Sequence, residues 1–248
     1  MWDWLSAPID AARAHDVGPL VSWHARAMVL AWAVLAPLAV IVARFFKIVP
    51  GQNWPEELDH KFWWRSHWIG QSLVFLLSVL GLLTILPAER SGAGLHGVLG
   101  YALLLGLLFQ VIFGLGRGNK GGPTAPGRDG STRGHHYDMT PWRRGFEMLH
   151  KSLGYGLLLL AAATILMGLW TVNAPRWMWI TLPIWWLALV IGFVWLQRRG
   201  FAVDTYQAIW GDSPAHPGNQ RPAPGWGVRR PGDGRHGGAK TRDITKTP

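Results

Sequence analysis

Four histidines lie at the ends of long apolar runs in this chain. His24 and His67 begin the runs "HARAMVLAW" and "HWIGQSLVF", and His96 and His150 begin two near-identical stretches, "HGVLGYALL" and "HKSLGYGLL". An ionisable side chain in such a run carries a free-energy cost, which favours a functional role. Because the chain has no cysteine, thiolate metal sites, iron–sulfur clusters and covalent c-type haem are excluded. Any haem in this chain must therefore be held non-covalently, and imidazole is a common axial ligand of haem iron.

Five apolar stretches are long enough to position these histidines at the two surfaces of a membrane. Each has about twenty residues, which as a helix cover a hydrocarbon core of roughly 30 Å. Continuous runs of this kind indicate helices, because lipid offers no hydrogen-bond partner to an open backbone. The sequence therefore predicts an all-α integral membrane fold with five transmembrane helices, over residues 23–46, 67–87, 94–116, 149–172 and 177–196.

Consecutive spans run in opposite directions, and this sorts the histidines into two levels. His24 and His96 begin the first and third spans and share the outer level, whereas His67 and His150 share the inner level. Two histidines that face each other across a four-helix bundle can hold a haem iron on both axial sides. We therefore predict an antiparallel four-helix core with two non-covalent haem b groups, in which the four histidines are the iron ligands.

Small residues and cations lie near the predicted ligands. A missing side chain one turn from a histidine leaves room for a flat macrocycle against the backbone, and the anionic propionates of haem favour nearby cations. The predicted cofactor-binding residues are therefore Gly70, Gly100, Gly154, Arg26, Arg65 and Lys151, with Ala27 beside His24 and with Arg90 and Arg144 as further cations near the two levels.

Each of these residues also has a simpler interpretation. A single histidine at a membrane surface is commonly a solvated residue, and each cation could serve only to set the topology. His60, seven residues before His67, becomes a rival ligand if the second helix begins earlier than expected. Gln71 and Gln110, which lie within spans, are interpreted as residues that hydrogen-bond between helices.

Lysine and arginine are concentrated in the connections on one side of the predicted membrane. Residues 44–65, residues 117–151 and the start of the tail carry most of the cations near the spans, and positive charge is retained in the cytoplasm. We therefore expect the N-terminus outside and the C-terminus inside. The net charge of +10 is interpreted as this topology signal, so no nucleic-acid partner is predicted.

The chain divides into four segments. Residues 1–20 lack the pattern of a cleavable signal peptide and form a periplasmic segment, either a surface-lying amphipathic helix or a frayed end. Residues 21–172 form the four-helix dihaem core, and residues 173–198 form the fifth transmembrane helix. Residues 199–248 form a cytoplasmic tail rich in Pro, Gly and Arg, for which disorder is the expectation and an extended strap on another subunit is the alternative.

Four stretches, taken in order, resemble the central helices of the cytochrome b561 family, particularly its bacterial members. They are "WHARAMVLAWAVLAPLAVIVARFFK", "HWIGQSLVFLLSVLGL", "LHGVLGYALL" and "MLHKSLGYGLLLLAAATILMGL", and the resemblance covers about residues 20–172. It implies two b-type haems, one per membrane face, that pass electrons across the membrane. The resemblance to bacterial members also implies that this membrane is the inner (cytoplasmic) membrane of a bacterium. By position it assigns His24 and His96 to one haem, and His67 and His150 to the other.

The chain departs from the animal and plant members of that family. Those members have six helices and use ascorbate near a cytoplasmic Lys-xxx-Lys-xx-His pattern, whereas this chain has Lys61-xxx-Arg65-x-His67. The resemblance therefore does not predict ascorbate as the electron donor.

Together these features predict a transmembrane dihaem cytochrome that transfers single electrons between redox partners. Because imidazole fills both axial positions of each iron, outer-sphere electron transfer is favoured over oxygen activation. The sequence does not identify the electron donor or the electron acceptor, and a quinol or a redox protein is a candidate for either. Membrane lipid is expected to surround the helices. The alternative is an accessory or anchoring subunit of a larger respiratory or photosynthetic complex, bound through the fifth helix and the tail. Whether the chain acts as an oxidoreductase enzyme is left open by the sequence.

Overall fold

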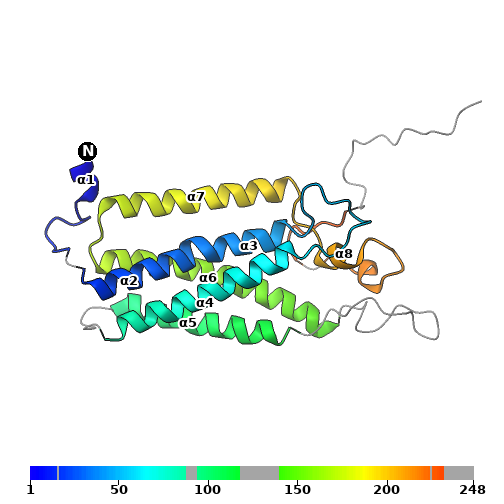
Figure 1. Cartoon of the computed structure of the whole chain (residues 1–248), viewed down its shortest axis with the longest axis horizontal. Helices are drawn as coiled ribbons and strands as arrows, with labels where there is room; N and C mark the ends of the chain where they lie inside the picture. Colours follow the sequence, from blue (N-terminus) through cyan, green and yellow to red (C-terminus); the bar gives the residue numbers. More distant parts are fainter. Residues whose placement is uncertain (16, 88–93, 118–139, 224, 232–248) are drawn as a thin grey trace, which may run out of the picture.

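A computed structural model shows an elongated bundle of helices (Figure 1). It describes residues 1–15, 17–87, 94–117, 140–223 and 225–231. Within these residues there is no strand, and β-type pairing is limited to two isolated bridges, Pro8 with Pro175 and Val203 with Arg229. We call the end that carries the N-terminal segment the outer end and the end that carries α8 (Thr205–Trp210) the inner end. These names follow the orientation predicted from charge.

Five helical segments among the described residues are long and apolar enough to cross a membrane, which confirms the predicted number of spans. The first span combines three consecutive segments, α2 (Pro19–Met28), the π-helix η1 (Val29–Leu35) and α3 (Ala36–Phe45). The other spans are α4 (Phe62–Ile85), α5 (Gly94–Leu115), α6 (Pro141–Thr171) and α7 (Arg176–Arg198).

The α6 helix begins eight residues before its predicted start at residue 149. Thr140 Oγ1 accepts a hydrogen bond from the backbone N–H of Arg143 at 3.2 Å, and Pro141 occupies the first turn, where a missing N–H costs nothing. Arg143 and Glu147 then pair on the helix at 3.2 Å. The start predicted from hydropathy is too late because these charged residues lower the mean hydropathy of the first turn. That turn is helical because it is well capped.

The first span contains its π-helical turn just ahead of Pro37. Proline has no N–H and cannot bond the carbonyl four residues earlier, which is that of Ala33. In the structure this carbonyl accepts a hydrogen bond from Trp185 Nε1 of α7 at 2.7 Å. A polar backbone group at membrane depth is thereby satisfied, and the same bond ties the fifth span to the first.

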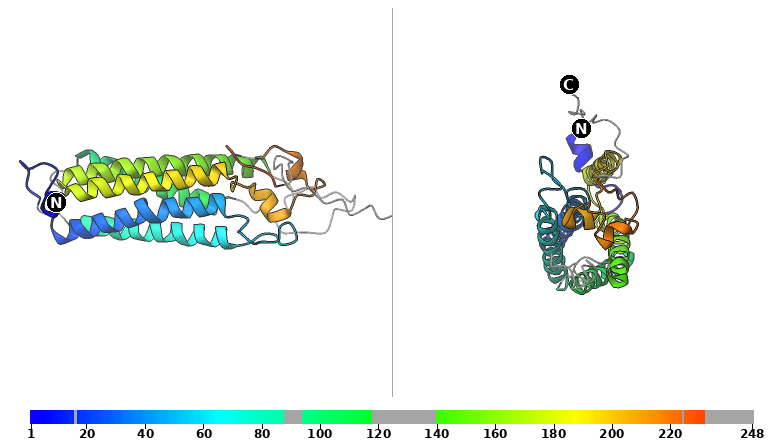
Figure 2. Two further views of the ribbon diagram at one scale, coloured as in Figure 1. Left: turned by 90° about the horizontal axis from the view of Figure 1, so that it is seen from above. Right: turned by 90° about the vertical axis from the view of Figure 1, so that its right-hand side faces the viewer.

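The first four spans pack as two antiparallel pairs. The first span lies along α4, and α5 lies along α6 (Figures 1 and 2). The pairs meet at mid-length, where η1 contacts α6. In this region the indole N–H of Trp32 donates to Ser78 Oγ at 3.0 Å. The buried core cluster is formed by Ala31, Trp32, Ala33, Ala36, Val74, Leu103, Leu107, Leu157, Ala161 and Ile165.

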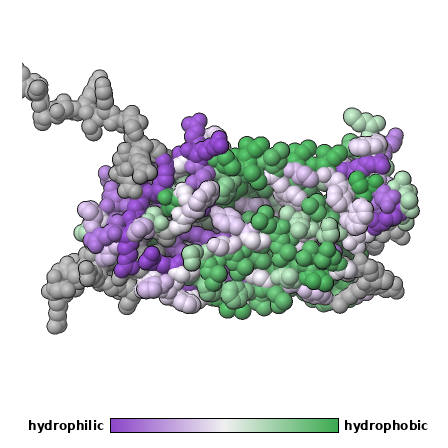
Figure 3. All heavy atoms as spheres, turned by 180° about the vertical axis from the view of Figure 1, so that it is seen from behind, coloured by the Kyte–Doolittle hydropathy of each residue, from purple (hydrophilic) through white to green (hydrophobic). Residues whose placement is uncertain are grey.

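The outside of the bundle is a broad apolar band between two more polar ends (Figure 3). The α7 helix has no buried residue, and its side chains Ile184, Leu187 and Ile191 are each more than half exposed. An apolar surface of this extent is typical of a face that contacts lipid. The band and the five apolar helices support a multi-pass membrane protein.

The N-terminal segment is held on the turn between α6 and α7. Its helix, α1 (Trp2–Ser6), is short, and Arg176 donates to the carbonyl of Trp4 at 3.2 Å. Asn173, with φ of 49°, donates through Nδ2 to the carbonyls of Asp10 and Arg13 at 2.9 and 2.7 Å. Asparagine tolerates this left-handed conformation. The segment is therefore anchored rather than frayed, and its helix is shorter than an amphipathic surface helix over residues 2–14 would be.

The first part of the tail folds over the inner ends of the helices. It contains α8 and the 3-10 turn η2 (Pro217–Gln220). Lys47 donates to the carbonyl of Val203 at 2.8 Å, and Arg230 pairs with the buried Asp204 at 3.0 Å. The expectation of disorder is therefore wrong for residues 199–223 and 225–231, because these long-range contacts order a segment whose Pro and Gly content suggests none. The remaining tail, residues 232–248, lies outside the described residues.

Candidate haem-binding site

His24 and His96 face each other at the outer end of the bundle. His24 lies on α2 and His96 on α5, and their ring centres are 6.1 Å apart with the ring planes at 88°. Both side chains are half-buried. Nδ1 of His24 lies 2.9 Å from the carbonyl oxygen of Gly81 on α4, and Nδ1 of His96 lies 2.9 Å from that of Thr164 on α6.

His67 and His150 face each other at the inner end. His67 lies on α4 and His150 on α6, with ring centres 6.2 Å apart and ring planes at 79°. Nδ1 of His67 lies 3.4 Å from the carbonyl oxygen of Ala39, whereas Nδ1 of His150 has no hydrogen-bond partner among the described residues. The His150 ring also stacks on Phe146, with 5.1 Å between ring centres. The structure thus brings together the pairs expected from topology, and the ligand role of the four side chains stays a prediction.

Both ring separations fit a single metal ion between two imidazoles. A metal–imidazole bond is about 2 Å long, so two imidazoles on opposite sides of one ion have ring centres about 6 Å apart. The observed separations are 6.1 and 6.2 Å. Within the described part of the chain, no third His, Asp or Glu joins a pair to form a larger metal-binding group. Each site therefore offers the two-imidazole donor set that suits the axial positions of haem iron.

The bonds to Nδ1 determine which ring nitrogen is available to a metal. A carbonyl oxygen only accepts hydrogen bonds, so Nδ1 of His24, His67 and His96 carries the hydrogen and Nε2 keeps its lone pair. Metal-bound histidines commonly donate through their second nitrogen in this manner, which orients the ring and raises the basicity of the ligand. Three of the four rings are thus oriented to ligate through Nε2.

The two pairs lie at well-separated depths on the same helices. On α4, His67 is fourteen residues before Gly81, whose carbonyl holds a ring of the outer pair. On α6, His150 is fourteen residues before Thr164, whose carbonyl holds the other outer ring. Fourteen residues of α-helix rise about 21 Å. One four-helix bundle therefore carries two separate sites, one toward each end.

The three predicted glycines have different surroundings. Beside Gly100 nothing lies within 4 Å of the position that a Cβ would take, so space is open there. At Gly154 a Cβ would meet Gln110 Nε2 at 3.4 Å, which is an ordinary contact. At Gly70 a Cβ would lie 2.8 Å from the Cβ of Ala39. The missing side chain of Gly70 is therefore needed for the packing of α4 on α3, and its role beside a macrocycle stays a prediction.

Gly168 of α6 is a site residue that sequence reasoning missed. A Cβ there would lie 2.9 Å from Cε1 of His96, so the ring reaches its bonded position only beside glycine. Gly81 on α4 is similarly close-packed, since a Cβ would lie 3.0 Å from Cε of Met28. The available signal was a glycine inside an apolar run, "LMGLW". Glycine is unfavourable within a helix unless a close approach requires it.

The predicted cations Arg26, Arg65 and Lys151 have different surroundings. Arg26 is exposed and stacks on Trp23, with its guanidinium carbon 5.1 Å from the ring centre. Arg65 is also exposed. Lys151 pairs with Glu147 at 3.2 Å and lines a cavity at the inner end. The role of these three cations as propionate partners stays a prediction.

Three further residues from the sequence analysis can be placed. His60 is exposed and lies before α4, so the early start of that helix does not bring it onto the helix with His67. Gln110 donates to the carbonyl of His150 at 2.9 Å, which confirms that it hydrogen-bonds between helices. Arg90 lies outside the described residues.

A protein-family model matches the part of the chain that forms the first three spans. The family is described as eukaryotic cytochrome b561, and the match covers residues 23–117, with three of the four paired histidines. No curated protein and no solved structure matches the chain. The family match supports membership of that family and, through it, the binding of haem b.

Proposed function

We propose that this chain, a member of the cytochrome b561 family, holds one haem b at each histidine pair and transfers single electrons from one face of the membrane to the other. In this proposal His24 and His96 hold the outer iron, and His67 and His150 hold the inner iron. The observation that carries the proposal is the ring separation of 6.1 and 6.2 Å at opposite ends of one bundle.

Haem b, when bound, supplies an iron that gains and loses one electron. The imidazoles of the chain would fill both axial positions and so keep dioxygen and other small ligands from the metal. The carbonyls of Gly81 and Thr164 hold the outer rings in place through Nδ1. Rings that are oriented in this way would hold an iron through Nε2.

The core between the two levels is apolar. Buried leucine, isoleucine and alanine side chains from α5, α6 and η1 form one cluster at mid-depth. A transport path for solutes needs polar groups that can replace their hydration. An apolar core of this kind therefore suits the transfer of electrons rather than the passage of solutes.

We further propose that the outer end faces the periplasm and the inner end the cytoplasm of a bacterium. The support is the charge near the ends of the spans, because Arg44, Lys151, Arg198 and Arg199 all lie toward the inner end. A quinol or a redox protein is the proposed class of electron donor or acceptor.

The proposal is tested by counting haem in the purified protein. We expect a b-type reduced-minus-oxidised spectrum and two haems per chain in a pyridine haemochrome assay. The protein concentration must come from amino-acid analysis, because haem absorbs in the near ultraviolet. One haem per chain, or a spectrum without b-type bands, would overturn the dihaem proposal.

A further inference from the structure

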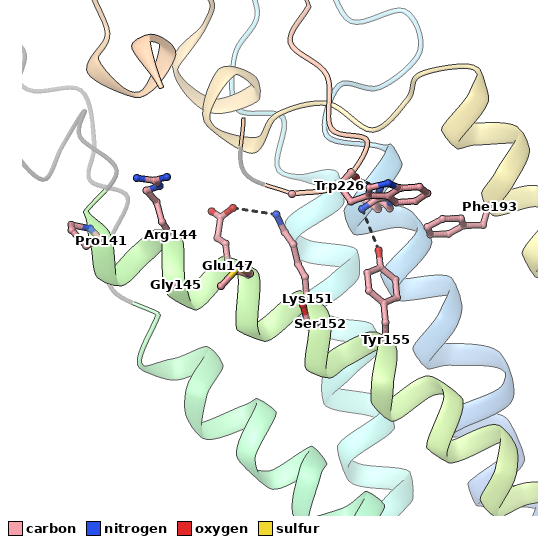
Figure 4. A pocket seen from close by; sticks show the side chains of 12 residues that line it. Pro141, Arg144, Gly145, Glu147, Lys151, Ser152, Tyr155, Phe193 and Trp226 are labelled. Carbon is pink, nitrogen blue, oxygen red and sulfur yellow. Dashed lines mark hydrogen bonds and ion pairs between the residues drawn. The ribbon is translucent and has the colours of Figure 1, made fainter. Parts of the chain in front are cut away.

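A cavity opens at the inner end, on a different side of α6 from His150. Its volume is about 840 Å³, which lies in the range of roughly 300–1,000 Å³ typical of ligand sites. The side chains of Glu147, Lys151 and Tyr155 rise from one face of α6 into it (Figure 4). Arg44 of α3, Phe193 of α7 and Trp226 of the tail complete the walls. The cavity is thus formed where the fifth span and the tail meet the core.

The charges around this cavity are predominantly positive. Glu147 is buried and is shared by two cations, Arg143 and Lys151, each at 3.2 Å. Arg44 and Arg144 also line the cavity, and neither has a carboxylate within ion-pair distance among the described residues. The nearby carboxylate of the tail, Asp204, is paired with Arg230 at 3.0 Å. Among the described residues that line the cavity, one carboxylate, Glu147, therefore stands against three cations, Arg44, Arg144 and Lys151.

Among the described residues, the groups that hold the Arg44 guanidinium in place are neutral. Its guanidinium donates to Gln197 Oε1 at 2.8 Å, to the carbonyl of Trp226 at 2.8 Å and to the hydroxyl of Tyr155 at 3.3 Å. It also lies over the ring of Phe193, with 5.3 Å to the ring centre. The described hydrogen-bond partners of this half-buried guanidinium are all neutral, so none of them compensates its positive charge.

The cavity also has an apolar side at the level where the spans end. Phe193 lies five residues before the end of α7. Met148 and Trp226 are strongly exposed, at 71% and 79%. Tryptophan at such a depth is typical of the boundary between headgroups and acyl chains. A ligand in this cavity would therefore meet cations toward the aqueous side and apolar side chains toward the membrane.

We infer that the cavity binds a phosphate-bearing anionic group, and that its source is the headgroup of an anionic membrane lipid. Basic pockets between transmembrane helices on the cytoplasmic side commonly bind such headgroups. Arg44 and Arg144 supply the charge that no described carboxylate compensates, and the Tyr155 hydroxyl supplies a further polar contact. The bound lipid would contact α6, α7 and the tail at the same time and would so hold them together at the membrane surface. This site is additional to electron transfer and does not depend on the presence of haem.

The experiment measures which lipid stays with the protein. The full chain is reconstituted in nanodiscs of phosphatidylcholine alone or of an equimolar mixture with phosphatidylglycerol, and retained lipid is counted by native mass spectrometry after release. We expect phosphatidylglycerol to be retained in preference to phosphatidylcholine. Arg144→Gln is expected to lower this retention roughly five-fold, and Arg44→Gln by at least as much, since each cation near a membrane contributes a factor of about this size.

The matched control is Arg198→Gln, which removes another exposed arginine at the inner end, one that does not line the cavity. Arg44→Lys is the second control, because it keeps the charge if loss of the Arg44 contacts to the tail disturbs the fold. We expect Arg198→Gln to leave lipid retention unchanged and Arg44→Lys to restore most of it. Haem content, measured on the same samples, distinguishes a specific loss of lipid from a loss of the folded haem protein.

Four results would overturn the inference. Equal retention of the two lipids would show that the site does not select charge, and an equal loss in Arg198→Gln would show a general surface effect. Unchanged retention in both Arg44→Gln and Arg144→Gln would place the lipid elsewhere. Displacement of the lipid by inorganic phosphate would show that free phosphate is the source of the anion. Each result is independent of the haem count, so it leaves the dihaem proposal unaffected.

Discussion

The outer and inner histidine pairs have nearly the same ring separation but are held differently. At the outer pair both Nδ1 atoms lie 2.9 Å from a backbone carbonyl oxygen. At the inner pair the corresponding distance for His67 is 3.4 Å, and Nδ1 of His150 has no partner among the described residues. The outer rings are therefore oriented by the backbone, whereas the His150 ring is oriented mainly by its contact with Phe146.

The difference is instructive because His96 and His150 lie in nearly the same local sequence. Across from His96, α6 presents the carbonyl of Thr164 to the ring itself. Across from His150, α5 presents the Gln110 amide to the backbone carbonyl of that histidine instead. The facing helix, not the repeated motif, sets the second partner of each ring. Since a bonded second nitrogen orients the ligand and strengthens it, we expect the outer pair to bind haem more tightly.

The largest effect is expected from removing one ring of each pair. His96→Ala should abolish the outer haem and His150→Ala the inner haem, because a single axial imidazole remains in each case. The haem count per chain should fall from two to one in both variants, and their reduced spectra should differ from each other. Identical residual spectra would mean that the two histidines belong to the same haem and would refute the pairing.

The next effect should be specific to the outer pair. In Gly168→Ala the new Cβ would lie 2.9 Å from Cε1 of His96, so the ring must leave its bonded position. We expect outer-site haem binding to weaken by about 1–3 kcal/mol, the usual cost of overpacking, with the inner site unchanged. Titration of the haem-free protein with haemin measures both affinities.

Gly156→Ala is the matched control for that substitution. Gly156 lies on the same helix, and nothing is within 4 Å of the position that its Cβ would take. Both affinities should equal those of the wild type. A similar loss in Gly156→Ala would show that α6 tolerates no added methyl group and would remove the argument for Gly168.

A third pair of substitutions separates helix packing from space for a macrocycle. Gly70→Ala should destabilise the haem-free protein by about 1–3 kcal/mol, because its Cβ would lie 2.8 Å from that of Ala39. Gly100→Ala meets nothing within 4 Å and should change that stability by less than about 1 kcal/mol. Thermal unfolding in detergent, followed by circular dichroism, measures both.

The open space beside Gly100 also has a consequence for haem. If the macrocycle lies there, Gly100→Ala should weaken outer-site haem binding although it leaves the haem-free fold intact. Unchanged haem affinity in Gly100→Ala would show that the ring occupies another side of α5.

The smallest effect is expected at the inner pair from Gln110→Leu. This substitution removes the 2.9 Å bond to the carbonyl of His150, which contributes about 1 kcal/mol if it is a typical buried hydrogen bond. We expect inner-site haem affinity to fall by less than ten-fold and the outer site to be unaffected. Loss of outer haem in this variant would show that the two sites are coupled through α5.

Part of this structure can be predicted from the sequence, because the length of an apolar run that crosses a membrane is set by the thickness of the hydrocarbon core. Five runs of about twenty residues imply five helices, and their alternating direction places His24 with His96 and His67 with His150. Helix ends are predicted less well where a capping residue starts the helix in a segment of low hydropathy. The Thr140 cap starts α6 at residue 141, inside a segment whose charges argue against a span.

The chain by itself determined the number of spans and the level of each histidine, since both depend only on residue order along helices of known rise. The tertiary structure decided which histidine rings meet a backbone carbonyl, why Gly168 must be glycine, and that the described part of the tail is ordered against Lys47 and Arg44. These features join residues that are far apart in the chain, at distances set by how the helices pack. No local pattern encodes such distances, so they become visible only once the helices are in place.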